Sequence, residues 1–478
     1  MERPLGNPGS HPLWNPAPGT GVGTDGKESE MSVDTLERPV DESPGRTSYR
    51  RRRWGLAALV AVVAAAGAFA FYTRPVAPVL VSDGAGTISS VDLDTGAARF
   101  TATNAVRAAD GSRIYRTEEA DGATVVEVLD PESGDIVAST SLGAKLEIRA
   151  VSPLGGAAAL MAPRPPGGDL YVPSPREVTS INVVWLDGRE AANYTLKGNF
   201  EPETFSTDES TLFLLEFYPA TAPDRYFVRQ LDLTTGEITE VTTPDQEIGI
   251  ELNPEMRGHA RAQAMAPDGS YLFSLYTIGQ DEAPVHDPAD PGTDRWAFVH
   301  TLNLVEKWSH CIFLPLPFGT GVESALSLGI AGDGRDLFVV DASTEAVARI
   351  DARKLQIDAV EVIPGLASSM ARPLAVGPEI VYIGMDHSVL EMGRETLIPN
   401  AAFVVNQSDG WLPITGLELA PDGRTLRVAH HNTISVLDMP TEKVVATLTS
   451  PGRTGASFLG DPVGDRTELS LEWVIPGG

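Results

Sequence analysis

The stretch Leu417–Leu448, LELAPDGRTLRVAHHNTISVLDMPTEKVVATL, constrains the fold of this 478-residue chain more than any other part of the sequence. It contains three runs of β-branched and aliphatic residues separated by two polar turns, the pattern of short antiparallel strands. Weaker copies of the unit recur from Val79 almost to the C-terminus. Because no segment after Val79 shows a sustained helical period, we expect an all-β repeat domain.

One marker of the repeat is an apolar run that ends in a polar residue just before a turn. Eight copies can be aligned, and their polar residues are Asp92, Asp130, Asp187, Asp232, Asn303, Asp351, Glu391 and Asp438. Most copies lie about 40 to 50 residues apart, a period typical of β-propeller blades. The two longest intervals contain the insertions Pro163–Arg176 and Gly279–Arg295.

A second marker, a tight turn between two strands, has the same phase. Its copies are centred on Asp110, Asp208, Asp268, Asp333 and Asp422. A missing copy falls at Gly377-Pro378. Asp-Gly pairs supply tight turns between neighbouring antiparallel strands. The two markers together predict eight blades, or seven if the unit around Glu391 is not a full blade.

The C-terminus carries a spare strand, Thr467–Val474, whereas the first unit begins at Val79 without an innermost strand. A single blade cannot bury both of its faces, so a ring of blades must close. We therefore expect the C-terminal strand to complete the first blade. The sequence predicts an all-β propeller over residues 79–478.

The unit Pro421–Leu448 resembles the YVTN-type propeller repeats of bacterial and archaeal surface proteins, within the wider quinoprotein- and lactonase-like propeller class. The resemblance is carried by Pro421-Asp422-Gly423, by Asn432–Asp438 and by Lys443–Leu448. The strand that gives the family its name reads Arg427-Val428-Ala429-His430 here. The resemblance implies a fold and a place at the bacterial cell surface, and little about activity, because propellers include enzymes, receptors and scaffolds.

A different organisation precedes the repeats. Residues 1–53 lack hydrophobic periodicity and are rich in Gly, Pro, Ser, Asp and Glu, which predicts a disordered cytoplasmic tail. Four arginines then precede residues 54–72, an uncharged apolar run that would span about 28 Å as a transmembrane helix. Only Arg74 follows closely, so the positive-inside rule predicts a cytoplasmic N-terminus and an extracytoplasmic C-terminal domain. Residues 73–78 form a short linker.

A cleaved signal peptide is the alternative for this segment. Ala68-Phe69-Ala70 could serve as a cleavage site, and an arginine cluster before an apolar run is a feature of twin-arginine signals. However, the charged region before the run is far longer than in an ordinary signal peptide. We therefore predict an uncleaved single-pass anchor.

The charge of the chain excludes some partners. The formal net charge is −29, and residues 1–53 contain equal numbers of acidic and basic residues, so the whole excess lies in residues 54–478. An acidic domain of this kind repels nucleic acid and anionic lipid headgroups. We expect no nucleic-acid partner.

Motifs for familiar chemistries are weak. The turns at Thr95-Gly96 and Thr235-Gly236 resemble those of quinone-dependent dehydrogenases, but Phe100 and Glu240 follow where tryptophan would be needed. The single cysteine, Cys311, lies in an apolar run and is interpreted as a buried structural thiol. No catalytic residue can be named, and no cofactor is predicted.

Metal binding has weak candidates in His259, His430 and His431, which lie at or just beyond predicted inner strands. Adjacent residues on a strand point to opposite faces, so at most one member of the His430-His431 pair could face the channel. The acidic loop Asp281–Asp294 lacks the spacing of a calcium-binding loop and is interpreted as a solvated insertion.

The sequence thus predicts a membrane-anchored extracytoplasmic propeller that acts as a binding or interaction module at the cell surface. Its expected partners are the membrane, through residues 54–72, and a protein or small molecule at the propeller face. The alternative is a lactonase- or dehydrogenase-like enzyme, or a metal carrier, that uses the central channel. That alternative requires inward-facing His, Asp, Glu or Arg side chains from at least three blades near one point.

Overall fold

The computed structural model divides the chain into two compact units, Met1–Arg74 and Pro75–Gly478. It describes residues 79–82, 86–92, 95, 97–165, 172–243, 256–279, 283–287, 290–405, 413–420, 423–430, 433–449 and 470–471. Residues 54–72, the predicted transmembrane helix, lie outside this set. Within the set, no helix has the length and apolar character needed to cross a membrane.

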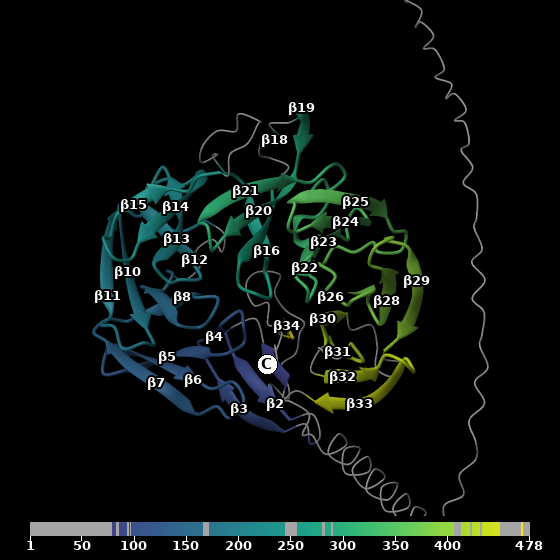
Figure 1. Cartoon of the computed structure of the whole chain (residues 1–478), viewed down its shortest axis with the longest axis horizontal. Coiled ribbons are helices and arrows are strands. Elements are labelled where there is room, and N and C mark those ends of the chain that lie inside the picture. The colour runs from purple at the N-terminus through teal and green to yellow at the C-terminus, as the bar shows by residue number, and fades with distance from the viewer. Residues whose placement is uncertain are drawn as a thin grey trace, which may run out of the picture. The chain divides into compact units, whose positions relative to one another are not determined.

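Eight four-stranded antiparallel sheets surround a central axis in the second unit, as Figure 1 shows. We number these blades 1 to 8 along the chain and give the strands of each from the axis outward. Blade 1 comprises β34 (Ser470–Leu471), β1 (Val79–Ser82), β2 (Ile88–Val91) and β3 (Ala98–Ala102), and blade 2 comprises β4 (Ala105–Arg107), β5 (Ile114–Ala120), β6 (Ala123–Leu129) and β7 (Ile136–Leu142). Blade 3 comprises β8 (Glu147–Val151), β9 (Ala157–Met161), β10 (Val178–Trp185) and β11 (Ala192–Lys197), and blade 4 comprises β12 (Asn199–Phe205), β13 (Thr211–Tyr218), β14 (Arg225–Asp232) and β15 (Ile238–Glu240).

The remaining four blades follow the same plan. Blade 5 comprises β16 (His259–Met265), β17 (Tyr271–Thr277), β20 (Ala297–Asn303) and β21 (Trp308–Phe313), and blade 6 comprises β22 (Leu326–Ile330), β23 (Asp336–Asp341), β24 (Ala346–Asp351) and β25 (Gln356–Val362). Blade 7 comprises β26 (Leu374–Val376), β27 (Ile380–Gly384), β28 (Ser388–Gly393) and β29 (Pro399–Val404), and blade 8 comprises β30 (Ile414–Leu419), β31 (Thr425–His430), β32 (Thr433–Asp438) and β33 (Lys443–Thr449). A hairpin of β18 (Val285–Asp287) and β19 (Asp290–Arg295) is inserted in blade 5, and a 3-10 turn, η1 (Glu323–Ala325), precedes blade 6.

The prediction of eight blades is confirmed. Each of the eight aligned polar residues lies in, or just after, the third strand of a blade. The unit around Glu391 is a full blade, since β28 pairs with both β27 and β29. The turns form as expected: Asp130 Oδ1 accepts hydrogen bonds from the backbone N–H groups of Glu132 and Ser133, at 3.0 and 2.9 Å.

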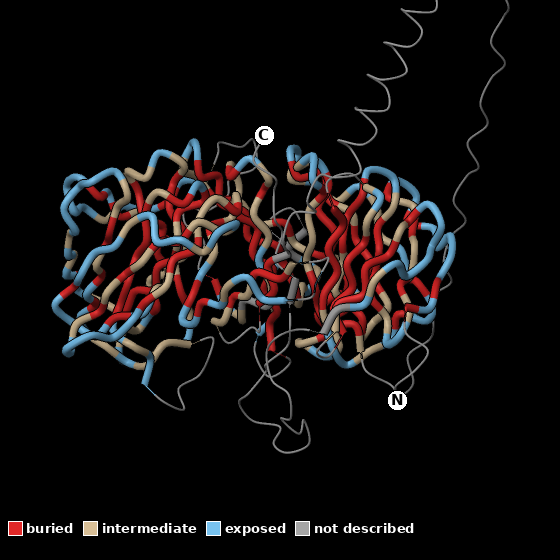
Figure 2. Tube along the Cα trace, turned by 90° about the horizontal axis from the view of Figure 1, so that it is seen from below, coloured by how far each residue is buried: buried red, intermediate tan, exposed pale blue. Residues whose placement is uncertain are grey.

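Apolar side chains between neighbouring blades form the core. Eight clusters of buried residues account for the eight interfaces between adjacent blades. Each cluster contains residues from the two blades that meet at its interface. All six residues of β23 are buried, because both faces of this strand are covered by other blades. The outer strand β7, by contrast, is mostly exposed. Figure 2 shows this distribution, with buried residues inside the ring and exposed ones along its outer surface.

The ring closes as predicted, by a strand from the C-terminus. Val81 and Ser82 of β1 pair with Leu471 and Ser470 of β34. The interface between blades 8 and 1 is small, with Val81, Val91, Ile434 and Val436 as its buried apolar residues among those described.

Three long connections emerge on one face of the propeller. Strands alternate in direction, so the connections from second to third strands, and from each fourth strand to the next blade, share a face. We call it the loop face, and its long connections are residues 162–177, 241–258 and 278–296. They belong to three consecutive blades, 3 to 5, and include both insertions recognised in the sequence.

Ending the chain after Gly464 removes the closing strand and should lower the melting temperature by roughly 5 °C or more. The physical reason is that β1 becomes an unpaired edge facing the axis. Thermal unfolding followed by circular dichroism measures the change. A chain that ends after Val474 retains β34 and should melt within about 1 °C of the full chain. Equal melting temperatures for all three chains would contradict closure by β34.

Candidate functional site

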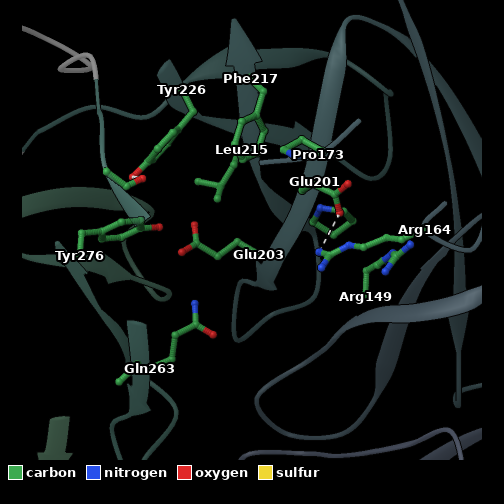
Figure 3. Close-up of a pocket in the computed structure, with 13 residues that line it drawn as sticks. Arg149, Arg164, Pro173, Glu201, Glu203, Leu215, Phe217, Tyr226, Gln263 and Tyr276 are labelled. Carbon is green, nitrogen blue, oxygen red and sulfur yellow. Dashed lines mark hydrogen bonds and ion pairs between the residues drawn. The ribbon is translucent and has the colours of Figure 1, made fainter. Parts of the chain in front are cut away.

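A cavity of about 440 Å³ opens between blades 3, 4 and 5, close to the loop face. Its walls come from the inner strands of these blades and from the connections 162–177 and 241–258. Figure 3 shows the side chains that line it. The described lining residues are Arg149, Arg164, Pro173, Glu201, Pro202, Glu203, Leu215, Phe217, Tyr226, Gly258, Ala262, Gln263 and Tyr276.

The inner strands of all three blades are bulged at this cavity. The pairing of β8 with β9 shifts between Ile148 and Ala150, which leaves Arg149 as the extra residue. The shift in β12 leaves Glu203 as the extra residue, and that in β16 leaves Arg261. A bulge bends a strand and re-aims a side chain, and bulges are frequent next to functional sites. The backbone thus turns Arg149 and Glu203 toward the cavity.

Three arginines surround one buried glutamate at one end of the cavity, which we call the basic end. The side chain of Glu201 is 9% exposed. Its Oε1 accepts a short hydrogen bond from Arg176 Nη2, and its Oε2 lies 3.7 Å from Arg164 Nη2. Arg164 and Arg176 belong to the connection 162–177 and Arg149 to β8, so blade 3 supplies all three arginines that lie near Glu201 of blade 4.

Arg149 is the most enclosed of these arginines, with a side chain 10% exposed. Its Nη2 donates to the Ala162 carbonyl at 2.8 Å, and its Nη1 lies 3.4 Å from Glu147. Its Nε is buried and has no hydrogen-bond partner among the described residues. Burial lowers the pKa of Arg149 from its ordinary value; the carboxylates of Glu201 and Glu147 oppose this change, and the positive charges of Arg164 and Arg176 add to it. The basic end therefore contains a buried guanidinium donor that the described residues leave without a partner.

The opposite end of the cavity, which we call the acid end, is built around Glu203. Gln263 Nε2 donates to Ser274 Oγ at 3.0 Å, and Ser274 Oγ donates to Glu203 Oε1 at 3.2 Å. The other oxygen of Glu203, Oε2, is buried and has no hydrogen-bond partner among the described residues, although the residue as a whole is half-buried. In Figure 3 the hydroxyl of Tyr276 and the amide of Gln263 point toward this carboxylate.

Aromatic side chains enclose the acid end. The rings of Tyr226 and Tyr276 are 5.7 Å apart and tilted. The hydroxyl of Tyr226 donates to the Arg257 or Gly258 carbonyl, at 3.2 or 3.4 Å. The hydroxyl of Tyr276, a residue 2% exposed, interacts with the hydroxyl of Tyr226. Leu215 and Phe217 complete an apolar wall between the two ends.

Burial raises the pKa of Glu203 to about 7, and the hydrogen bond from Ser274 opposes this only in part. No cation is paired with Glu203 among the described residues. Burial also raises the pKa of Tyr226 and Tyr276 well above the usual value, with a contribution from the Glu203 carboxylate. Glu203 thus changes its charge near neutral pH, whereas both tyrosines stay protonated.

The central channel has a different character. A cavity of about 430 Å³ is bounded by the inner strands of blades 2, 5, 6, 7 and 8. Among its described lining residues only Arg107 and Gln263 have polar side chains. The rest are apolar residues such as Met265, Leu328 and Leu374, together with glycine backbone. The described lining of this cavity therefore lacks the convergence of ionisable groups that chemistry on the axis would require.

The histidine candidates lie apart. His259 is in blade 5, where its Nδ1 is 3.8 Å from Glu323 Oε2. His430 is in blade 8, 5% exposed, and its ring is hydrogen-bonded to Ser435 and Thr433 within its own blade at 2.9 Å. His431 lies outside the described residues. The described part of the chain contains no group of three His, Cys, Asp or Glu residues that could hold a metal ion.

Two other segments considered in the sequence lie in blade 5 or in its insertion. Cys311 lies in β21, and burial raises the pKa of its thiol to about 12, which keeps it protonated. Part of the acidic loop Asp281–Asp294 forms the β18–β19 hairpin, in which His286 lies 3.7 Å from Asp294. Asp281 and Glu282 lie outside the described residues.

Sequence reasoning missed every residue of the cavity. The available signal was the segment Asn199–Phe205, NFEPETF, in which two glutamates flank a proline inside a predicted inner strand. Proline is tolerated there because the innermost strand is an edge. The insertion Pro163–Arg176 was recognised, but nothing in the sequence indicated that its arginines contact Glu201.

Replacing Glu203 with glutamine should change how stability depends on pH. The pKa of Glu203 is about 7 in the folded protein against about 4.5 in the unfolded chain, so the folded state binds more protons between these values. The contribution of Glu203 to stability is therefore greatest below the unfolded value and falls as pH rises through 7. From pH 5 to pH 8, E203Q should gain up to about 3 kcal/mol relative to the original protein, since one pKa unit corresponds to about 1.4 kcal/mol.

Urea unfolding at both pH values measures this difference. Glu391→Gln is the matched control, because Glu391 is also half-buried with a raised pKa, in distant blade 7, and the shift is smaller. The same pH dependence for E203Q and the original protein would contradict a buried, unpaired Glu203.

Known proteins resemble this chain only in fold. No family model and no curated protein matches the sequence. Similar solved structures include the dihydro-heme d1 dehydrogenase NirN in complex with DHE, at 14% identity and a TM-score of 0.47, covering 80% of this chain and 75% of that one. Apo AztD from Citrobacter koseri has 13% identity and a TM-score of 0.46, covering 79% and 95%. BamB from Moraxella catarrhalis has 11% identity and a TM-score of 0.40, covering 73% and 90%. At these values the likeness indicates nothing about activity, and the assignment of eight blades rests on the sheets themselves.

Proposed function

We propose that the propeller is a binding module that takes a small organic anion into the cavity between blades 3, 4 and 5. The observation that carries this proposal is the basic end, where the buried Nε of Arg149 has no hydrogen-bond partner among the described residues and Arg164 and Arg176 lie nearby at Glu201. A cluster of arginines is unexpected inside a domain with a large negative charge. An anionic ligand supplies a partner for the unpaired donor of Arg149.

The chemistry of arginine defines the ligand group. A guanidinium presents a planar fork of N–H donors that matches a carboxylate or a phosphate. The Nε of Arg149 is a buried donor with no partner among the described residues, and leaving such a donor unpaired costs about 1 to 3 kcal/mol. A bound carboxylate can satisfy this donor. The cavity volume, about 440 Å³, is typical of sites for small molecules.

Binding is favoured over catalysis by the residues present. The described lining of the cavity contains no serine, cysteine, histidine or lysine, the usual nucleophiles and bases. One observation supports an enzyme as a second candidate: the pKa of Glu203, raised to about 7 by burial, suits a general acid or base. Turnover of a bound ligand, followed by proton NMR, would favour the enzyme.

The location of the protein is part of the proposal. Residues 54–72 have the length and apolar character of a single membrane span, and the arginines before them favour a cytoplasmic N-terminus. The propeller then lies outside the cytoplasm, where its loop face is available to a ligand or a protein partner. Its acidity makes nucleic acid an unsuitable partner.

Replacing Arg149 with glutamine should weaken binding of pentanoate at least about tenfold, because a hydrogen bond to a charged group contributes about 1.5 to 3 kcal/mol. Isothermal titration calorimetry with the full chain measures the affinity, with inorganic phosphate as a second anion. Arg349→Gln is the matched control in blade 6, since the Arg349 side chain is 12% exposed and its Nε is also buried without a partner among the described residues. Equal weakening by both variants, or no binding of either anion, would contradict the proposal.

Deleting residues 54–72 should move the protein from the membrane fraction to the soluble fraction of expressing cells, because the apolar segment is the proposed anchor. Ultracentrifugation and immunoblotting measure the distribution, and the intact mass of the mature protein distinguishes an anchor from a cleaved signal. The control removes residues 1–45, which lack apolar periodicity, and should stay with the membrane. A deleted protein that still sediments with the membrane would contradict anchoring by this segment.

A further inference from the structure

The acid end of the cavity lacks a cation. Glu203 Oε2 is buried, and no described side chain donates a hydrogen bond to it. Tyr276 is almost fully buried, and its hydroxyl points toward the Glu203 carboxylate in Figure 3. Burying a carboxylate without a partner costs several kcal/mol or forces it to keep its proton. A strand bulge nevertheless directs this carboxylate into an open cavity, so we look to a ligand for its partner.

An ammonium group is the ligand group that best fits this end. It offers several N–H donors and a positive charge, whereas an ionised carboxylate only accepts hydrogen bonds. Oε2 of Glu203 is an acceptor that the described protein groups leave free, and the hydroxyl oxygen of Tyr276, which points toward it in Figure 3, is a second acceptor. The tilted rings of Tyr226 and Tyr276 add aromatic faces, which attract cations.

The two ends are separated by a short apolar wall. Glu201 and Glu203 are two residues apart on β12, a separation of about 7 Å along a strand. Leu215 and Phe217 of β13 line the space between the ends and suit methylene groups. A ligand that reaches both ends must therefore carry its two charged groups several bonds apart.

We propose that the ligand is a zwitterion, an ω-amino acid or a short peptide, with its carboxylate at Arg149 and its ammonium at Glu203. This inference rests on the proposed function, because it places the anionic group at the basic end. It adds a second recognition site at the acid end and a chemical class for the ligand.

Binding of an ammonium must be accompanied by loss of the Glu203 proton. The ligand binds as a cation, Glu203 changes from carboxylic acid to carboxylate, and one proton passes to solvent. The titratable groups that face Glu203 are Tyr276 on β17 and Tyr226 on β14, with Cys311 and His300 behind them and Glu201 on its own strand. Burial holds the pKa of His300 near 3 and that of Cys311 near 12, and both tyrosines stay protonated. The side chain of Arg261 lies outside the described residues.

The test compares ligands that differ only in the ammonium. Isothermal titration calorimetry on the full chain at pH 6.5 uses the series from 3-aminopropanoate to 6-aminohexanoate, glycylglycine, and the carboxylates that lack the amine. We expect at least one member to bind about tenfold more tightly than its amine-free counterpart. Titrations in buffers of different ionisation enthalpy should show release of up to one proton per zwitterion bound, and no release with the simple carboxylate.

Variants assign the effect to its site. Glu203→Gln should abolish both the preference for the zwitterion and the proton release, whereas Glu391→Gln, its counterpart in blade 7, should retain both. If zwitterions and simple carboxylates bind equally, and Arg149→Gln weakens both, the inference fails while the proposed function stands. If neither class binds, both fail. A preference that survives in Glu203→Gln overturns the assignment of the ammonium to Glu203.

Discussion

Apolar contact between neighbouring blades is the interaction on which the rest of this structure depends. A four-stranded sheet has two faces, and here each buries them against the sheets on either side, through clusters that together account for all eight interfaces. Such an arrangement has no natural end until the first blade meets the last. The pairing of β1 with β34 and the small cluster of Val81, Val91, Ile434 and Val436 complete the ring. Buried residues inside and exposed residues at the rim follow from this geometry (Figure 2).

A closed ring holds the innermost strands in position, and these strands can still carry polar side chains. These strands are edges, so bulges and a proline can be accommodated without loss of a neighbour's hydrogen bonds. In blades 3 and 4 the bulged residues are Arg149 and Glu203, and both line one cavity. One connection on the loop face, residues 162–177, supplies Arg164 and Arg176. The blades thus position Arg149 and Glu203, and the strand bulges and the loop-face connection give the cavity its charged groups.

Electrostatics distinguish this cavity from the rest of the molecule. The chain is strongly acidic, yet one end of the cavity concentrates arginine, while the other encloses a carboxylate with no described cation beside it. Buried charges lower stability unless they are paired. Arg149 and the Glu203 carboxylate line one cavity of about 440 Å³, and a ligand with opposite charges at its ends supplies a partner for each. The central channel, lined mainly by apolar groups and backbone, offers no comparable arrangement among the described residues.

The sequence by itself indicated the all-β class, the phase of the blades, a count of eight or seven and the closing strand, because strand and turn patterns are local and recur with a fixed period. Asp130 and Glu391, for example, mark the third strands of their blades, because the strand-and-turn pattern at each depends only on the residues next to it in the sequence. The cavity could not be predicted in this way. Arg149, Arg176 and Glu203 come from different blades and an insertion, and only the ring brings them together. The bulges that aim two of them arise from pairing with a neighbouring strand, and the pKa of Glu203 is set by burial; both depend on tertiary structure.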